Sequence, residues 1–172
     1  MVLIIKKALK KDQSLFDKTQ KQTLLGSYYE TEKMPVDLGK INNKDYFIFF
    51  NNKVIGLLRM GESNEFCGRY GIGFVGLVPL YRGKGLSRKI ISFCKKMAQK
   101  NGITDLLLSV PKKSKETRKI FEKLGFKNKE IRATIVFNDC YFMSLSREQQ
   151  KYLDLSKRTG LLEWQIMSQK IN

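Results

Sequence analysis

Seven short apolar runs and three stretches of helical periodicity alternate along this chain. The runs have the length of strands and occupy residues 2–9, 45–50, 54–60, 70–78, 104–110, 133–137 and 141–145. Apolar positions at intervals of three and four residues predict helices from Asp12 or Ser14 to about Glu32, from the glycine turn at residues 83–85 to Asn101-Gly102, and after Ser114 to Lys123. The pattern therefore predicts an α/β domain, and 172 residues suffice for one core.

Two pairs of runs have the spacing of hairpins. Asn51-Asn52-Lys53 separates 45–50 from 54–60, and asparagine tolerates the left-handed backbone of a tight turn. Asn138-Asp139 separates the last two runs in the same way. The segment after residue 146 begins with a capping-box pattern at Ser146 and is expected to be helical, with its Trp164 docking on the domain or on a second subunit.

The run over 70–78 leads through Pro79 and two glycines, Gly83 and Gly85, into the helix that ends at Asn101-Gly102. Proline ends strand pairing, and glycine permits φ values that other residues avoid. A strand, a glycine turn and a helix start direct several unpaired N–H groups, and the positive end of the helix dipole, to one point. This arrangement favours a phosphate group, although a plain structural turn explains two glycines equally well.

Two known phosphate loops do not fit the turn. The dinucleotide-binding pattern needs a third glycine where this chain has Arg88, and the P-loop needs Lys followed by Ser or Thr after its last glycine. The spacing that fits is Arg-x-x-Gly-x-(Gly/Ala), with Arg82, Gly85 and Ser87, the last being a departure from the usual Gly or Ala. This segment, together with Ile120-Phe121-Glu122-Lys123-Leu124-Gly125-Phe126, resembles the GNAT N-acetyltransferase superfamily.

The resemblance implies a mixed, mostly antiparallel sheet of about seven strands flanked by helices, with residues 1–146 as the acetyltransferase domain and 147–172 as a helical C-terminal extension. It also implies acetyl-CoA as cosubstrate. Gly71, Gly73 and Gly76 would let the strand over 70–78 bulge and splay to admit pantetheine, a loosely packed strand being the alternative. The residues expected to bind the coenzyme are Leu77, Val78, Arg82, Gly83, Lys84, Gly85, Leu86, Ser87, Ser114 and Phe121.

The family reaction is direct attack of an amine on the thioester, and two of its customary proton-handling residues are missing. Phe121 stands where many members have the tyrosine that protonates the leaving thiolate, and Gly73 and Phe74 stand where acidic residues are common. Candidate bases or acids are Glu62, Glu65 and Tyr141, each of which also reads as a surface or packing residue. An acceptor whose amine is already partly neutral, such as an α-amine, would reduce the need for a base.

Composition narrows the function classes further. The chain has no histidine, which excludes histidine-based mechanisms, and its three cysteines have no metal-ligand spacing, so no metal is expected. No apolar run approaches about 20 residues, so no membrane span is expected. Without an export signal, a reducing cytoplasm is the expected compartment. Cys94 falls on the apolar side of its helix and is expected in the core.

The formal net charge of +17 has two interpretations. A lysine-biased composition would give a solvated basic surface, whereas a functional field would attract tRNA or another polyanion. The leading functional prediction is an acetyl-CoA-dependent N-acetyltransferase acting on a primary amine of a small molecule, a peptide or aminoacyl-tRNA, with a homodimer as one expected assembly. The alternative is a CoA-binding module without turnover that acts as a sensor or binds a partner or nucleic acid.

Overall fold

The computed structural model describes residues 2–27, 30, 38–62, 68–137, 140–145 and 160–171, with side chains except in 132–137, 140–145 and 160–162. The chain divides into two compact units. The first comprises Met1–Gly61 and Ile72–Gly102, and the second comprises Glu62–Gly71 and Ile103–Asn172. The glycine turn over residues 83–87 lies in the first unit.

Four strands follow one another across the sheet of the first unit. In sheet order they are β1 (Leu3–Lys7), β2 (Asp45–Phe50), β3 (Lys53–Glu62) and β4 (Tyr70–Leu77). β2 is antiparallel to both β1 and β3. Asn51 and Asn52 connect β2 to β3 with φ values of 47° and 64°, so the predicted hairpin is confirmed and both asparagines adopt the left-handed conformation of a type I′ turn.

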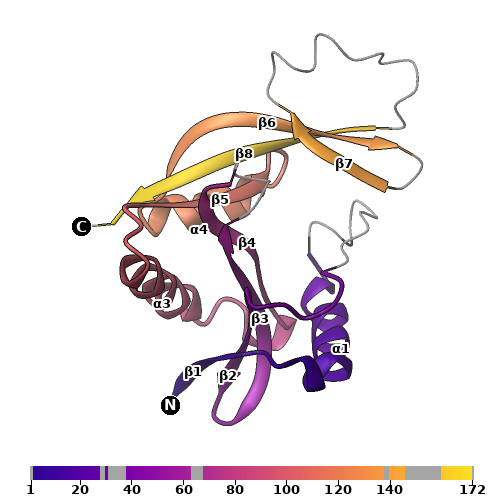
Figure 1. The fold of residues 1–172 in the computed structure, drawn as a ribbon, viewed down its shortest axis with the longest axis vertical. Coiled ribbons are helices and arrows are strands. Elements are labelled where there is room, and N and C mark those ends of the chain that lie inside the picture. Colours follow the sequence, from indigo (N-terminus) through magenta and orange to yellow (C-terminus); the bar gives the residue numbers. More distant parts are fainter. Residues whose placement is uncertain are drawn as a thin grey trace. The chain divides into compact units, whose positions relative to one another are not determined.

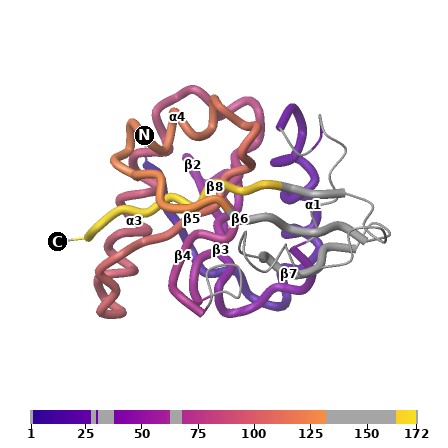
Figure 2. The backbone as a smooth tube through the Cα atoms, turned by 90° about the horizontal axis from the view of Figure 1, so that it is seen from above, coloured from indigo at the N-terminus to yellow at the C-terminus, as the bar shows by residue number. Residues whose placement is uncertain are grey.

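Helices α1 (Gln13–Leu24) and α3 (Leu86–Lys100) lie on opposite sides of strands β1–β4 (Figures 1 and 2). Short 3₁₀ turns precede them, η1 (Lys10–Asp12) and η3 (Pro79–Tyr81). On the α1 side, Phe16 packs edge-to-face on Phe47 at 6.0 Å between ring centroids. On the α3 side, Tyr46 contacts Phe93 in the same geometry. The side chains of Tyr46 and Phe47, which are adjacent in β2, thus point to opposite faces of the sheet, because side chains alternate along a strand.

The second unit is built on four strands and one helix. The strands are β5 (Asp105–Pro111), β6 (Lys127–Phe137), β7 (Cys140–Leu145) and β8 (Gly160–Lys170), and the helix is α4 (Lys115–Lys123). The sheet order is β5-β8-β6-β7, and every neighbouring pair is antiparallel. β5 and β6 therefore run parallel to each other on either side of β8.

The sequence predicts a helix in the C-terminal segment, and this prediction is wrong for residues 160–170, which form β8 between β5 and β6. Residues 147–159 of that segment lie outside the described residues. Four consecutive residues of β8, Gln165 to Ser168, are all buried. A strand covered on both faces shows no alternation of apolar and polar positions, so its pattern cannot be distinguished from that of a buried helix.

The remaining predictions of fold are largely confirmed. The fold is mixed α/β, with a mostly antiparallel sheet flanked by helices, and the described residues contain eight strands because β8 adds to the seven expected. Helix α1 ends at Leu24 rather than near Glu32, and Gly26 follows with φ +61°, a common helix stop. None of the helices in the described part of the chain is long and apolar enough to cross a bilayer.

Candidate functional site

The glycine turn connects the end of β4 to the start of α3, as the sequence predicts. Pro79 opens the short turn η3, and the N–H of Arg82 closes it by donating to the carbonyl of Pro79 at 3.0 Å. The N–H of Val78 donates to the carbonyl of Ile55 at 2.9 Å, and the carbonyl of Val78 accepts from the N–H of Tyr81. The main chain that enters the turn is therefore fixed to β3 before the glycines begin.

Both glycines of the turn adopt conformations that favour glycine. Gly83 has φ +72° and Gly85, the N-cap of α3, has φ +71°. A Cβ atom at either position would meet no heavy atom within 4 Å, so open space lies directly beside the backbone. The glycines are thus needed for their φ values and also leave room for a ligand that approaches the main chain closely.

Several main-chain donors of this turn lack an acceptor among the described residues. Among the described residues, none of the main-chain hydrogen bonds at this turn engages the N–H groups of Gly83, Gly85, Leu86 or Ser87, and Gly85 supplies no side-chain cap. The first N–H groups of any α-helix lack partners inside the helix, and the helix dipole places positive charge there. An exposed turn with free N–H groups and an open backbone fits a phosphate or diphosphate group. The sequence prediction of an anion site is consistent with this geometry.

Arg82 is directed into the protein rather than into the open space beside the glycines. Its Nε donates to the carbonyl of Leu77 and its Nη2 to the carbonyl of Thr23, both at 2.9 Å. Burial lowers the pKa of Arg82 from its ordinary value, and the charge of Glu30 partly opposes this effect. The side chain expected to add charge to the coenzyme site instead connects the turn to the end of β4 and the last turn of α1.

The other predicted residues of the turn divide between core and surface. Leu86 is buried, and Ser87 is half-buried in the first turn of α3. Lys84 is exposed, and its ammonium lies 5.3 Å from the centroid of the Tyr81 ring. Tyr81 in turn packs edge-to-face against Phe50 at the end of β2. Lys84 is thus an exposed cation within this turn, and its ammonium lies over the Tyr81 ring.

The glycines of β3 and β4 allow the two backbones to approach each other closely. A Cβ at Gly56 would lie 2.2 Å from the carbonyl oxygen of Gly76. A Cβ at Gly76 would lie 2.9 Å from Cβ of Thr23 and 3.0 Å from the ring of Phe74. Gly76 is therefore required for packing of the strand against β3 and α1. The expected splay of the strand for pantetheine stays a prediction.

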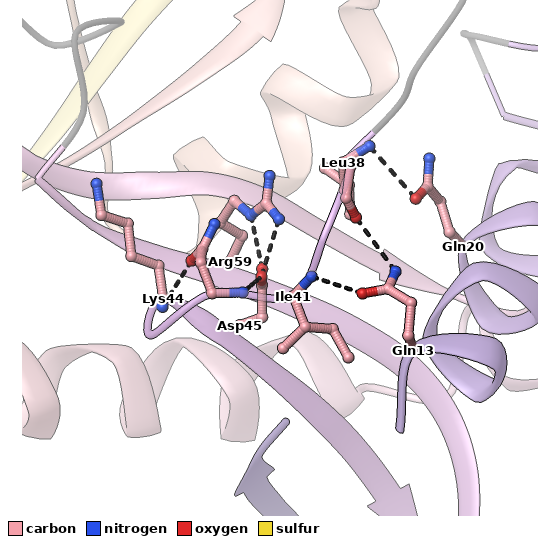
Figure 3. A network of polar contacts seen from close by, with 9 residues as sticks. Gln13, Gln20, Leu38, Ile41, Lys44, Asp45 and Arg59 are labelled. Atoms are coloured by element: carbon pink, nitrogen blue, oxygen red, sulfur yellow. Dashed lines mark hydrogen bonds and ion pairs between the residues drawn. The ribbon is translucent and has the colours of Figure 1, made fainter. Parts of the chain in front are cut away.

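A polar network holds the loop before β2 in place, and Figure 3 shows its residues. The buried carboxylate of Asp45 accepts from Nε of Arg59 at 2.6 Å and from Nη2 at 2.8 Å. The side-chain oxygen of Gln13 in α1 accepts from the N–H of Ile41 at 2.8 Å, and that of Gln20 accepts from the N–H of Leu38 at 3.3 Å. These contacts bind residues 38–45 to α1 and β3.

Ser114 and Phe121 lie on or next to α4 in the second unit. Ser114 is the N-cap residue, as predicted, and its hydroxyl donates to the hydroxyl of Thr117 at 2.8 Å. The half-buried ring of Phe121 packs edge-to-face on Phe126, with 5.8 Å between centroids. Their predicted contacts with the coenzyme stay predictions, as does the contact expected of Leu77.

The three acid or base candidates are not brought together by any described contact. Glu62 is exposed at the end of β3. Tyr141 lies in β7, paired in register with Val136, and Glu65 lies outside the described residues. Sequence reasoning missed Thr23 and Gly26, next to which the Arg82 guanidinium lies; a Cβ on Gly26 would lie 3.5 Å from Nη1. In the sequence, the signal that could have identified the end of α1 is Gly26, a glycine directly after a helical pattern.

Two further features bear on the chemistry. In the described part of the chain, no group of three or more His, Cys, Asp or Glu side chains is placed to hold a metal ion. Cys94 is fully buried in α3, as predicted, and burial raises its pKa to about 12, so its thiol is neutral at physiological pH. It is therefore a packing residue, because the thiolate is the nucleophilic form.

Comparisons with known proteins place this geometry in context. The profile of the Acetyltransferase (GNAT) family matches residues 13–126. Comparison with curated protein sequences finds no significant match. The ribosomal-protein-S18-alanine N-acetyltransferase from Escherichia coli is similar in structure, with TM-score 0.61 and 15% identity over 99% of this chain and 95% of that one.

Two further solved structures contain coenzyme groups. Arabidopsis thaliana Naa50, in complex with the bisubstrate analogue CoA-Ac-MVNAL, has TM-score 0.57 and 14% identity over 99% of both chains. A GNAT family acetyltransferase from Elizabethkingia anophelis with acetyl-CoA bound has TM-score 0.58 and 13% identity over 98% of this chain and 97% of that one. At these identities the likeness is one of fold.

Proposed function

Because the chain belongs to the GNAT family of acetyltransferases, we propose that it transfers the acetyl group of acetyl-CoA to a primary amine. The observation that supports this most directly is the turn over residues 83–87, which combines free N–H donors, two left-handed glycines and open space beside the backbone. Hydrogen bonds to a charged group contribute about 1.5–3 kcal/mol each, so three or four could supply much of the roughly 8 kcal/mol of micromolar binding.

The chain's own residues would act mainly by positioning. The N–H groups of residues 83–87 would hold the diphosphate, and Lys84 would add a positive charge beside it. Arg82 would keep the turn in this shape through its hydrogen bonds to the carbonyls of Leu77 and Thr23. Acetyl-CoA supplies an activated thioester, which a neutral amine can attack directly.

The acceptor we propose is an amine of low pKa. At pH 7, deprotonating a lysine-type amine costs about 4–5 kcal/mol, whereas an α-amine costs about 1 kcal/mol. Phe121 has no proton to donate, so a site that works without strong acid or base assistance suits an α-amine better than a lysine-type amine. The α-amine of a peptide, or of the amino acid carried by a tRNA, fits this requirement.

The test is an amine panel with acetyl-CoA, in which CoA release and the acetylated product are both quantified. We expect the rate constant kcat/KM to be larger for peptide α-amines than for lysine side chains, and to rise with pH following only the pKa of the acceptor. An enzyme-owned pKa that disappears in Glu62→Gln or Glu65→Gln would contradict a mechanism without a base. Product formation distinguishes transfer from simple hydrolysis of the thioester.

A second function is supported by Phe121 itself. Its ring packs on Phe126 without a hydroxyl group, so a CoA-binding module that has lost turnover is the alternative. If calorimetry detects acetyl-CoA binding while no amine in the panel yields product above the background, the alternative replaces the first proposal. If neither binding nor product is detected, both proposals fail.

A further inference from the structure

Helix α3 carries cations without any acidic residue. From residue 66 to residue 104 the sequence contains eight Lys or Arg and no Asp or Glu, although the whole chain has about one acidic residue for every two basic ones. Five of the eight lie on α3, at Arg88, Lys89, Lys95, Lys96 and Lys100. We call these five residues the basic face of α3.

The five cations share one side of the helix. At 100° per residue they fall within an arc of roughly 140° that also includes Ser92 and Gln99. The opposite side carries Ile90, Ile91, Cys94 and Ala98, which are at most 3% exposed. Four cations of the basic face are exposed and Lys95 is half-buried. The polar side of α3 is therefore a continuous cationic surface.

In the part of the chain that the structure describes, no carboxylate pairs with a cation of the basic face. Arg88 and Lys89 also lie in the first turn of the helix, where the dipole disfavours a cation by about 0.3–1 kcal/mol. By contrast, the lysines at the start of the chain are interspersed with Asp12 and Asp17, and those of α4 with Glu116 and Glu122.

We propose that the basic face of α3 binds the phosphate backbone of a nucleic acid. Arg88 and Lys100 are twelve residues apart, which corresponds to about 18 Å along a helix. At a spacing of about 3.4 Å between phosphates along one strand, roughly five phosphates span that length, which equals the number of cations. Lysine and arginine contacts to phosphate supply affinity and position without reading the base sequence. The surface is built for sequence-independent binding.

The same face fits a membrane or an acidic protein less well. Amphipathic helices that bind lipid insert their apolar side into the membrane interface, but the apolar side of α3 is buried in the protein core. Protein interfaces depend on buried aromatic or aliphatic anchors, and the basic face offers only charged and small polar side chains. This proposal is independent of turnover, because it concerns the side of α3 rather than the turn before it.

Fluorescence anisotropy with a labelled 20-nucleotide RNA of mixed sequence tests the proposal. For five phosphate contacts, log K should fall with log[salt] with a slope of about −3.5, a loss of about 100-fold between 50 and 200 mM KCl. The variant Lys95→Gln/Lys96→Gln/Lys100→Gln should bind at least about 10-fold more weakly and lower the slope by about 2. Its residues lie away from the turn, so acetyl-CoA affinity measured by calorimetry should not change.

The matched control is Lys10→Gln/Lys11→Gln/Lys18→Gln, which removes three exposed lysines of η1 and α1 and changes the net charge equally. It should bind RNA within about 2-fold of the original protein. Equal losses in both variants would overturn the proposal, because binding would then follow total charge. Tighter binding to vesicles with 30% phosphatidylserine than to RNA would also overturn it. Unchanged circular dichroism excludes misfolding, and single Lys96→Gln gives the readout if the triple variant unfolds.

Discussion

The guanidinium of Arg82 donates to the carbonyl oxygen of Thr23 at 2.9 Å, across 59 positions of the sequence. A second donor of the same group reaches the carbonyl of Leu77. One side chain thereby joins the end of β4 and the end of α1 to the turn that precedes α3. Main-chain carbonyls at helix ends lack partners inside the helix, so Arg82 also satisfies an acceptor that α1 leaves open.

Replacing Arg82 should loosen the turn as well as reduce stability. We expect Arg82→Met to lower the free energy of unfolding by about 1–3 kcal/mol, since it removes two charge-assisted hydrogen bonds. Acetyl-CoA affinity should fall in parallel. Arg82→Lys keeps the charge but not the two-directional geometry of guanidinium, and it should recover less than half of either loss. If Arg82→Lys restored coenzyme affinity completely, the charge at this position would matter and the hydrogen bonds to the carbonyls of Leu77 and Thr23 would not.

Substitutions at Gly85 should distinguish the need for a positive φ from the need for open space beside the backbone. Gly85→Ala places a Cβ at φ +71° and should cost about 1 kcal/mol of stability. Gly85→Asn tolerates that φ value better, so its stability should be nearly that of the original protein. Its side chain nevertheless enters the space beside the free N–H groups. Calorimetry should therefore show at least a 10-fold loss of acetyl-CoA affinity in Gly85→Asn, and undiminished affinity would rule out this turn as the diphosphate site.

Phe121→Tyr tests whether a proton donor is missing. The ring is half-buried and packed on Phe126, so a hydroxyl should be tolerated with little change in melting temperature. General acids typically contribute about 10²–10⁴-fold, and even an imperfectly placed hydroxyl should raise kcat by about 10-fold. Phe121→Leu serves as the control, because it supplies no proton and should leave kcat unchanged. Equal kcat in the Tyr variant would mean that thiolate departure needs no acid here.

The buried Asp45–Arg59 pair should be a major stabilising contact of the first unit. Asp45 is fully buried and accepts two hydrogen bonds from Arg59 and one from the N–H of Asn42. Asp45→Asn leaves the arginine without its counter-charge and should lower the free energy of unfolding by about 3 kcal/mol. Urea titration measures this loss. As a comparison, Lys112→Gln removes the partly exposed pair with Glu163 and should lower the free energy of unfolding by less than about 1 kcal/mol.

Alkaline pH should destabilise the protein through Cys94. Its folded pKa is about 12, whereas an unfolded thiol has a pKa near 8.5. Well below pH 8.5 the thiol is neutral in both states and has no effect. As pH rises from there toward 12, only the unfolded state ionises, so unfolding becomes easier by about 1.4 kcal/mol per pH unit. Cys94→Ala should show a flatter decline of stability between pH 9 and 11, and parallel declines would contradict the assignment.

Local signals in the sequence identified the parts of the fold that local interactions determine. Asn51-Asn52 predicted a hairpin because few residues adopt positive φ, and Gly83 and Gly85 predicted the turn before α3 for the same reason. The strand over 160–170 was missed because its identity depends on partners, β5 and β6, that are distant in sequence. The direction of Arg82 was missed too, since a motif assigns residue types and not the carbonyls they contact.

The position of β8 has a consequence for biosynthesis. While a nascent chain still lacks residues 160–170, β5 and β6 have no strand between them, and each presents unpaired N–H and C=O groups. The ribosome adds about 5–20 residues per second, so synthesis of the stretch from residue 137 to residue 170 takes a few seconds. During that interval chaperones, or a second nascent chain, can pair with the open edges. The pairing of β5 and β6 with β8 therefore waits until residues 160–170 have been synthesised.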